Sequence, residues 1–227
     1  MSELLRLDVA SDTICPWCYI GKRRLAGALA TLGVEGLAFA VTWRPFQLNP
    51  TMPKEGVARR EYRTQKFGSW ERSQQLDAQV AEAGRSEGLA FRHDLMERTP
   101  NTLASHALIR LALEAGGESL QDRVVEDLFV AYFTQGQDIG NLEILAGLGE
   151  QAGLDSANVQ AALSDEGVLA AVAEEESRIR ASGLDGVPGF FVEGHFLFAG
   201  AHPAPVMARA LREVSATFGK GRAAASG

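Results

Sequence analysis

The chain has 227 residues, a length that fits one domain or one domain carrying a large insertion. Apolar residues make up 46% of it and charged residues 22%, which is typical of folded soluble proteins rather than disordered or membrane-spanning ones. With 22 Lys and Arg against 29 Asp and Glu, the net charge is −7, which argues against a surface for nucleic acid.

The whole cysteine content is one pair, Cys15 and Cys18, which is too few for a disulfide-stapled secreted scaffold. Arg6 and Asp8 interrupt the first apolar run, so this segment does not resemble a secretory signal. No later stretch approaches the ~20 apolar residues of a membrane span. We therefore expect a cytoplasmic protein that does not engage a membrane.

The first 50 residues predict a β-α-β unit. Residues 4–9 form a short apolar run, and residues 38–43 alternate in the manner of a strand. Between them, residues 16–32 predict a helix with Pro16 in its first turn and Gly33 at its end. A right-handed crossover of this kind makes the two strands parallel.

From residue 51 to residue 183 the pattern changes to helices. Apolar residues at helical spacing predict helices over residues 103–111 and 120–132, another from Asn141, and another through residues 169–183. Residues 55–88 are polar with few apolar anchors, and they predict a solvated helix.

Strand signals return towards the C-terminus. Residues 189–192 and 195–198 predict the two arms of a hairpin, joined by a tight turn at Glu193-Gly194. A last helix is expected to end near Gly219, before a small, basic and flexible tail. The predicted division is an α/β domain in two parts, residues 1–50 and 184–219, with a helical insertion over residues 51–183 and a tail over residues 220–227.

The segment Cys15-Pro16-Trp17-Cys18 places two thiols three residues apart, where the first predicted strand gives way to a helix. A thiolate at a helix N-terminus is stabilised by free backbone N–H groups and by the helix dipole. We therefore expect Cys15 to be exposed and to attack a substrate disulfide. Cys18 lies one turn into the helix, so we expect it to be more buried and to resolve the mixed disulfide.

The alternative for the two cysteines is a buried structural pair or half of a zinc site. Zinc usually needs four ligands, and the chain has four histidines. None of them forms a His-x₃₋₅-His partner to the cysteines, since His195 and His202 are seven residues apart. We therefore expect no metal and favour redox chemistry.

Several further segments resemble one known family in combination. They are Ser11 to Gly21 around the cysteines, Trp43-Arg44-Pro45-Phe46-Gln47-Leu48-Asn49-Pro50, Asn101-Thr102 with His106, Ala131-Tyr132-Phe133, Gly186-Val187-Pro188, and Gly200-Ala201. In this order they resemble DsbA-family proteins of the FrnE type over nearly the whole chain. The resemblance implies the α/β class, a thioredoxin-like fold with a large all-helical insertion, and thiol–disulfide oxidoreductase activity.

Pro188 follows Val187 just before a predicted strand, where an X-Pro bond is cis at modest cost. A cis bond would aim the backbone N–H and C=O of Val187 towards a docked partner. In thioredoxin-like proteins, which this chain resembles, the cis proline packs against the catalytic disulfide and helps bind the substrate chain. A turn proline at a strand start is the alternative.

Pro16 and Trp17 separate the two cysteines. Trp17 is interpreted either as an apolar docking surface or as a cover for the fold. Many DsbA relatives carry His at the position of Trp17, where its charge favours the thiolate. Trp17 cannot do this, so it predicts a less oxidising couple.

Several charged residues carry a less specific signal. Asp8 and Asp12 flank the first predicted strand and could shuttle a proton from Cys18, but we interpret them as solvated or capping carboxylates. We interpret His106 as a satisfied core histidine, and His202 as a helix cap rather than a residue that tunes the site. The runs 22–24 and 174–176 predict solvated helix faces, although the basic run could attract an acidic ligand such as glutathione.

Together these features predict a cytosolic oxidoreductase that reduces or isomerises disulfides through Cys15 and Cys18. Its partners would be a disulfide-containing protein or small thiol conjugate, and a cellular reductant such as glutathione or a thioredoxin system. No cofactor is expected, apart from glutathione as a co-substrate.

Two other functions stay open. One is a glutathione-dependent isomerase or transferase of the 2-hydroxychromene-2-carboxylate isomerase or kappa-class type. Those relatives typically carry Ser at the position of Cys15 and lack the second cysteine, so glutathione supplies the thiolate. The other is a binding or chaperone module in which the cysteines act as a redox switch.

Overall fold

The computed structural model describes residues 4–225, with side chains for residues 4–218. Its centre is a four-stranded sheet in the order β2 (Phe39–Pro45), β1 (Leu5–Ser11), β5 (Gly189–Val192) and β6 (His195–Ala199). The pair β1–β2 is parallel, whereas β5 runs antiparallel to both β1 and β6. Strands from the two ends of the sequence therefore form one sheet.

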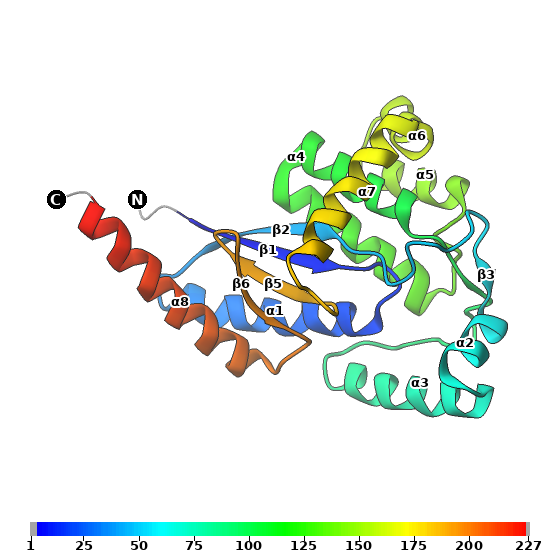
Figure 1. Cartoon of the computed structure of the whole chain (residues 1–227), viewed down its shortest axis with the longest axis horizontal. Coiled ribbons are helices and arrows are strands. Elements are labelled where there is room, and N and C mark those ends of the chain that lie inside the picture. Colours follow the sequence, from blue (N-terminus) through cyan, green and yellow to red (C-terminus); the bar gives the residue numbers. More distant parts are fainter. Residues whose placement is uncertain (1–3, 226–227) are drawn as a thin grey trace.

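Alternation along the strands gives the sheet two covered faces, because successive side chains point in opposite directions. Leu7 and Val9 belong to the larger core, with residues of α1 (Pro16–Val34) and α8 (Ala204–Ala225). On β1, Ala10 packs instead in a smaller cluster with Phe46, against Ile179 of α7 (Glu166–Ala181). Helices α1 and α8 thus cover one face, and α7 packs on the other (Figure 1).

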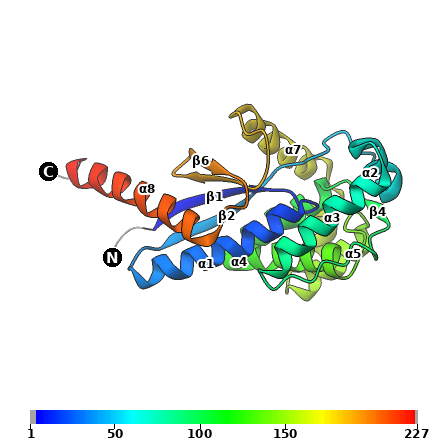
Figure 2. The same ribbon diagram turned by 90° about the horizontal axis from the view of Figure 1, so that it is seen from below.

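The chain between β2 and β5 is mostly helical. Its remaining elements are β3 (Val57–Ala58), α2 (Arg59–Phe67), α3 (Trp70–Arg85), β4 (Arg98–Thr99), α4 (Leu103–Phe129), the π-helical turn η1 (Val130–Thr134), α5 (Leu142–Gln151) and α6 (Ser156–Ser164). Helices α2–α6 gather at the end of the molecule away from the C-terminal end of α8, and α3 lies beside α1 (Figures 1 and 2). Among the described residues, none of the helices is long and apolar enough to cross a membrane.

This architecture confirms the predicted thioredoxin-like α/β fold with a helical insertion. The parallel register of the first two strands pairs Leu5 with Phe39 and continues to Ser11 with Pro45. The predicted hairpin turn is present as well. Glu193 and Gly194 both have positive φ, 50° and 80°, as a type I′ turn requires.

The polar segment predicted as one solvated helix forms two helices. Gly68 ends α2 in the left-handed conformation, at φ 87°, and the Ser69 side chain then caps α3 by accepting from the Arg72 N–H. The segment is also less solvated than predicted, because Arg59 is buried.

Several helices differ from the prediction. The two helices expected over residues 103–132 are joined in α4 across non-helical residues Gly116 and Gly117. Helix α6 carries no prediction of its own. Helix α8 continues past Gly219 to Ala225, where a flexible tail was predicted, and residues 226–227 of that tail lie outside the described residues.

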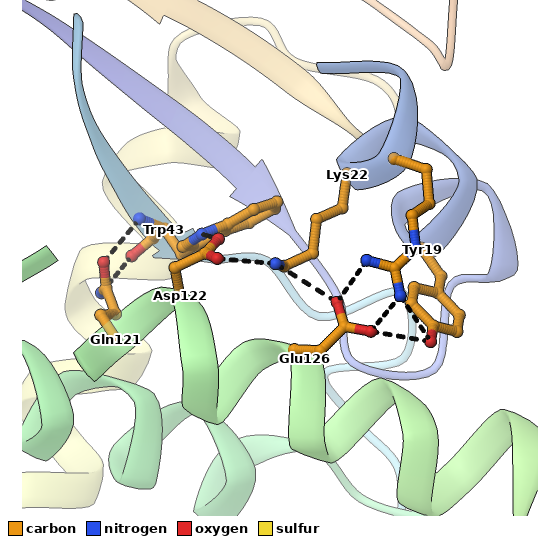
Figure 3. Close-up of polar contacts among 7 residues, drawn as sticks. Tyr19, Lys22, Trp43, Gln121, Asp122 and Glu126 are labelled. Carbon is orange, nitrogen blue, oxygen red and sulfur yellow. Dashed lines mark hydrogen bonds and ion pairs between the residues drawn. The ribbon is translucent and has the colours of Figure 1, made fainter. Parts of the chain in front are cut away.

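The basic run on α1 is not a solvated face, because it anchors α1 to α4 (Figure 3). Lys22 Nζ lies 2.8 Å from Asp122 Oδ2 and 3.3 Å from Glu126 Oε2. Arg23 pairs with Glu126 too, and Tyr19 donates to that carboxylate over 2.9 Å. Arg24 pairs instead with Glu87, at 2.7 Å, so each charge of the run that was expected to attract a ligand has an acidic partner.

The acidic run on α7 is partly buried rather than solvated. Glu176 is 4% exposed and accepts hydrogen bonds from the Arg180 side chain and, at 3.4 Å, from the Gln47 backbone N–H. Arg44, whose role the sequence left unexplained, bridges Glu175 at 3.2 Å and Asp8 at 2.7 Å. Helix α7 is therefore tied to β1 and β2 by charge as well as by apolar packing.

Candidate active site

Cys15 occupies the N-cap of α1. The chain leaves β1 at Ser11, and the Asp12 carbonyl accepts a hydrogen bond from the Cys15 N–H over 3.0 Å, which turns the chain. Cys15 itself has extended backbone, and Pro16 follows in the first helical turn, where its missing N–H costs nothing. The sulfur of Cys15 therefore lies at the positive end of the helix dipole and makes no capping hydrogen bond to the helix backbone.

Burial of the two thiols matches the prediction only in part. Cys18 is fully buried and so is the more buried of the two, but Cys15 is only 5% exposed, which makes the prediction of an exposed Cys15 wrong. The Cys15 thiol lies against the carbonyl of Val187, 172 residues away in the chain, a contact that no local pattern reveals. Cys15 is reached through a cavity instead.

Val187 and Pro188 lie directly against Cys15. The Val187–Pro188 peptide bond is cis, and the Cys15 thiol donates to the Val187 carbonyl oxygen over 3.7 Å. On the helix side, Gly21 makes room for the proline ring, because a Cβ at this position would lie 2.9 Å from Pro188 Cγ. The proline loop, the first cysteine and one helical turn of α1 thus form a single packed unit.

The buried environment acts on the second thiol. Burial raises the pKa of Cys18 well above its usual value, and the hydrogen bond and charge of Cys15 raise it further. Hydrogen bonds from the Ser11 side chain and the Asp12 backbone act in the opposite direction. Cys18 is therefore a protonated thiol at neutral pH.

The cavity at Cys15 has a volume of about 400 Å³ and lies between the end of α1 and the helices α2 and α3. Its lining includes Arg59, Arg63 and Lys66 on α2, and a single carboxylate, Asp77 on α3. Asp77 pairs with both arginines, at 2.8 and 2.6 Å. The lining therefore carries more positive than negative charge, although the whole chain is acidic.

The rest of the lining is apolar or aromatic. Trp17, 41% exposed, stands at the cysteines, and Tyr62, Phe67, Tyr132 and Phe133 contribute rings. His93 adds no charge near pH 7, because burial lowers its pKa below the usual value. The cavity thus offers aromatic walls and cationic groups next to the first thiol.

Sequence reasoning missed the cations of this cavity, although a signal was available. Arg59 and Arg63 are four residues apart and Lys66 follows three later, a spacing that places all three on one side of a helix. That side would have stood out had residues 59–67 been recognised as a separate short helix.

Other predicted residues lie outside the cavity. Asp12 is fully buried and accepts from the Leu48 N–H over 2.7 Å, so it is neither solvated nor the cap of α1. His106 is buried as predicted, but its Nε2 finds no hydrogen-bond partner among the described residues, so it is not satisfied. His202 is exposed, and its Nε2 lies 3.0 Å from the Ala199 carbonyl.

Within the described part of the chain, no group of three or more metal-ligating side chains could hold an ion.

A thioredoxin-like sheet with a Cys-x-x-Cys segment at the start of its first helix, facing a cis-proline, defines the class of thioredoxin-fold thiol–disulfide oxidoreductases. Residues 6–212 match the family model described as a DSBA-like thioredoxin domain. The chain belongs to this DsbA-like family.

Individual proteins are similar to this chain as well. The solved structure of a probable DsbA oxidoreductase, SCO1869 from Streptomyces coelicolor, is 31% identical, with a TM-score of 0.80 over 92% of this chain and 89% of that one. The uncharacterized protein YwbO of Bacillus subtilis is 29% identical over 70% of this chain and 72% of its own. The cytosolic disulfide reductase DsbM from Pseudomonas aeruginosa is 21% identical, with a TM-score of 0.63 over 94% of this chain and 100% of that one, which shows a shared fold.

Proposed function

We propose that the protein is a disulfide reductase or isomerase in which Cys15 attacks and Cys18 resolves. The observation that carries the proposal is the position of the Cys15 sulfur at the start of α1, in the wall of a cavity and 3.7 Å from the Val187 carbonyl. This arrangement stabilises the attacking thiolate and provides a backbone acceptor beside it for a bound chain.

The reaction has two displacements. The Cys15 thiolate attacks one sulfur of a substrate disulfide, a Cys15–substrate disulfide forms, and the other substrate sulfur leaves as a thiolate. Cys18 then loses its proton and attacks the Cys15 sulfur, so that the Cys15–Cys18 disulfide forms and the reduced substrate leaves. A cellular dithiol or glutathione returns the cysteine pair to its reduced form.

The cavity supports a substrate or co-substrate that carries negative charge. Arg63 and Lys66 line the same cavity as Cys15, so an anionic thiol or disulfide is attracted towards the reacting sulfur. Glutathione fits this description and is proposed as a co-substrate, alongside disulfide-containing proteins. The sequence predicted that the basic run on α1 could attract an acidic ligand. We propose instead that the cations of α2 bind this ligand.

Location in the cytosol is part of the same proposal. A reductase needs its dithiol in the reduced form, which a reducing compartment maintains. DsbM, which shares the fold, is described as a cytosolic disulfide reductase. We propose the same location and the same activity for this chain.

Two measurements test the function. Insulin reduction should proceed with the wild-type protein and be lost in Cys15→Ser, and equal rates for the two proteins would refute the assignment. The Cys18→Ser variant should retain its partner on Cys15 as a stable mixed disulfide. The trapped molecule then separates protein substrates from glutathione.

The cationic cavity also favours a second candidate, a glutathione-dependent isomerase or transferase. In that case bound glutathione would supply the thiolate, and Cys15 would only be a neighbour of it. Conjugation or isomerisation activity that survives in the double variant Cys15→Ser, Cys18→Ser would promote this candidate over the first.

A further inference from the structure

Two buried titratable side chains lie behind the active-site helix and have no part in the reaction as described so far. Asp12 is fully buried and His106 is 3% exposed. His106 Nε2 lies 3.6 Å from Asp12 Oδ1 and has no hydrogen-bond partner among the described residues. Buried polar atoms in folded proteins are nearly always hydrogen bonded, so this arrangement calls for an explanation.

Neighbouring hydrogen bonds hold the two side chains in place. Asp12 Oδ2 accepts from the Leu48 N–H over 2.7 Å. Thr13 follows Asp12 in the chain, and Ser105 precedes His106. The hydroxyls of Thr13 and Ser105 are hydrogen bonded to each other over 2.8 Å, which joins the segment after β1 to the first turn of α4. The short gap between the imidazole and the carboxylate is therefore fixed by the fold on both sides.

His106 lies between the surroundings of Cys18 and a second opening. The Ser11 side chain contacts the Cys18 thiol, and Ser11, Thr13 and His106 line one small cavity of about 10 Å³. That volume is roughly what one water molecule needs. His106 also lines a cavity of about 430 Å³ that shares no lining residue with the one at Cys15.

We propose that His106, oriented by Asp12, accepts the proton that Cys18 releases when it attacks the mixed disulfide, and returns it to solvent through the second cavity. The inference rests on the proposed dithiol function. As the Cys18–Cys15 bond forms and the Cys15–substrate bond breaks, the electron pair leaves on the substrate sulfur. The Cys18 proton passes by way of Ser11 and the small cavity to the imidazole.

The chemistry of the two thiols explains why such an acceptor matters. Burial raises the pKa of Cys18, so it must lose its proton during the attack rather than before it. His106 Nε2 lies 3.6 Å from Asp12 Oδ1, close enough for the carboxylate to orient the ring. His106 is thus a positioning residue that acts on Cys18 through the polar groups between them.

The charges around this pair are mixed. Asp12 faces His106 from the end of β1, Arg44 and Glu175 come from β2 and α7, and Arg178 from α7. Arg110 and Glu114, which pair at 2.8 Å, lie one and two turns further along α4. Arg44 is itself paired with Asp8 and Glu175, so Asp12 is the charged side chain that lies directly against the His106 ring.

The test separates the two displacements with 5,5′-dithiobis(2-nitrobenzoate), which releases one coloured thiolate when Cys15 attacks and a second when Cys18 resolves. In His106→Ala we expect the first release to stay within about twofold of wild type. The second should slow by on the order of 10²-fold near pH 7. The difference in the rate of the second release should shrink as pH rises, because Cys18 then ionises unaided. Added imidazole, which the second cavity can admit, should restore the rate of the second release.

Ile109→Ala is the matched control, because Ile109 lines the same two cavities and has no titratable group. It should leave the second release and its pH profile unchanged. If His106→Ala does not fold, His106→Gln replaces it and should show the same slow second release. A normal second release in either variant, or a slow one that neither pH nor imidazole restores, overturns the inference. Absence of the first release in wild type would instead refute the proposed function.

Discussion

The thiol of Cys15 is hydrogen bonded to the carbonyl oxygen of Val187 over 3.7 Å, a contact between residues 172 positions apart in the chain. The carbonyl belongs to the residue before the cis-proline, and the thiol to the N-cap residue of α1. When Cys15 forms a mixed disulfide it loses its proton, and the Val187 carbonyl becomes free to accept an N–H from the bound substrate. Reaction at the sulfur and binding at the backbone are therefore linked.

The first prediction concerns Gly21, which sets the distance between α1 and Pro188. A Cβ at this position would lie 2.9 Å from Pro188 Cγ, on a ring that cannot bend away. We expect Gly21→Ala to lower the free energy of unfolding by about 1–3 kcal/mol. It should also slow the reaction of Cys15 with disulfides, because Val187 moves with Pro188. Denaturant unfolding and insulin reduction measure the two effects.

Gly33→Ala is the control on the same helix. A Cβ at Gly33 meets nothing within 4 Å, so the variant should gain about 0.5–1 kcal/mol from the better helix propensity of alanine. Its insulin reduction rate should match that of wild type. If Gly21→Ala is stabilised like Gly33→Ala, the contact between the helix and Pro188 is not tight.

The second prediction follows from the raised pKa of Cys18. Because burial keeps Cys18 protonated at pH 8 and out of contact with solvent, iodoacetamide should alkylate Cys15 and leave Cys18 unmodified. Labelling of Cys18 should rise only as pH approaches and passes its raised pKa, because the thiolate that reacts with iodoacetamide forms only there. Peptide mass spectrometry identifies the modified cysteine.

In this experiment Cys18→Ser should label as fast as wild type at pH 8, whereas Cys15→Ser should label slowly. Equal labelling of the two cysteines at pH 8 would show that Cys18 is not shielded, and the division of labour between the thiols would need revision.

The third prediction tests the charge of the cavity. Lys66→Glu exchanges a cation in the lining for an anion, so the dianion 5,5′-dithiobis(2-nitrobenzoate) should react with Cys15 about tenfold more slowly at low salt. The difference should diminish at high ionic strength, where the charges are screened. The uncharged 2-hydroxyethyl disulfide should react at the wild-type rate.

Arg60→Glu makes the same change of charge on the same helix, but Arg60 is not part of the cavity lining and stands over the Trp70 ring instead. It should leave the reaction with the dianion nearly unchanged. An equal slowing in both variants would mean that the overall charge of the protein, rather than the cavity, controls the rate.

The features that the sequence predicts well depend on neighbours in the chain. The order of strand, helix and strand follows from periodicity between residues 4 and 43, and the hairpin follows from Glu193-Gly194. Cys15 at the N-cap follows from the residues on either side of it. Each of these can be recognised within about ten residues, because turn, cap and alternation are local properties.

What could not be predicted depends on the packing of distant segments. Lys22 looks the same in the sequence whether it faces water or Asp122, its partner 100 residues away. Cys15 lies against Val187 and shares a cavity with residues of α2 and α3, and these segments come together only in the folded chain. The unpaired nitrogen of His106 could not be predicted either, because it depends on how α4 packs against Asp12 in the folded chain.

The fourth prediction concerns Trp17 and the redox potential. Trp17 lies between the cysteines in the first turn of α1 and is 41% exposed, so a replacement there meets little resistance from packing. In Trp17→His, a protonated imidazole beside Cys15 would stabilise its thiolate by about 1 kcal/mol, a typical value for a charge at a helix end. Because the reduced form alone carries that thiolate, the couple should become more oxidising by about 20 mV.

The pH dependence of this shift distinguishes charge from shape. At pH 6 the introduced histidine is largely protonated and the shift should be present, whereas at pH 8 it is neutral and the shift should vanish. Trp17→Phe keeps the apolar ring and should match wild type at both pH values. Potentials are measured by equilibration with glutathione and mass-tagging of free thiols. A shift that persists at pH 8, or that appears equally in Trp17→Phe, would mean that the size of the side chain controls the potential and not its charge.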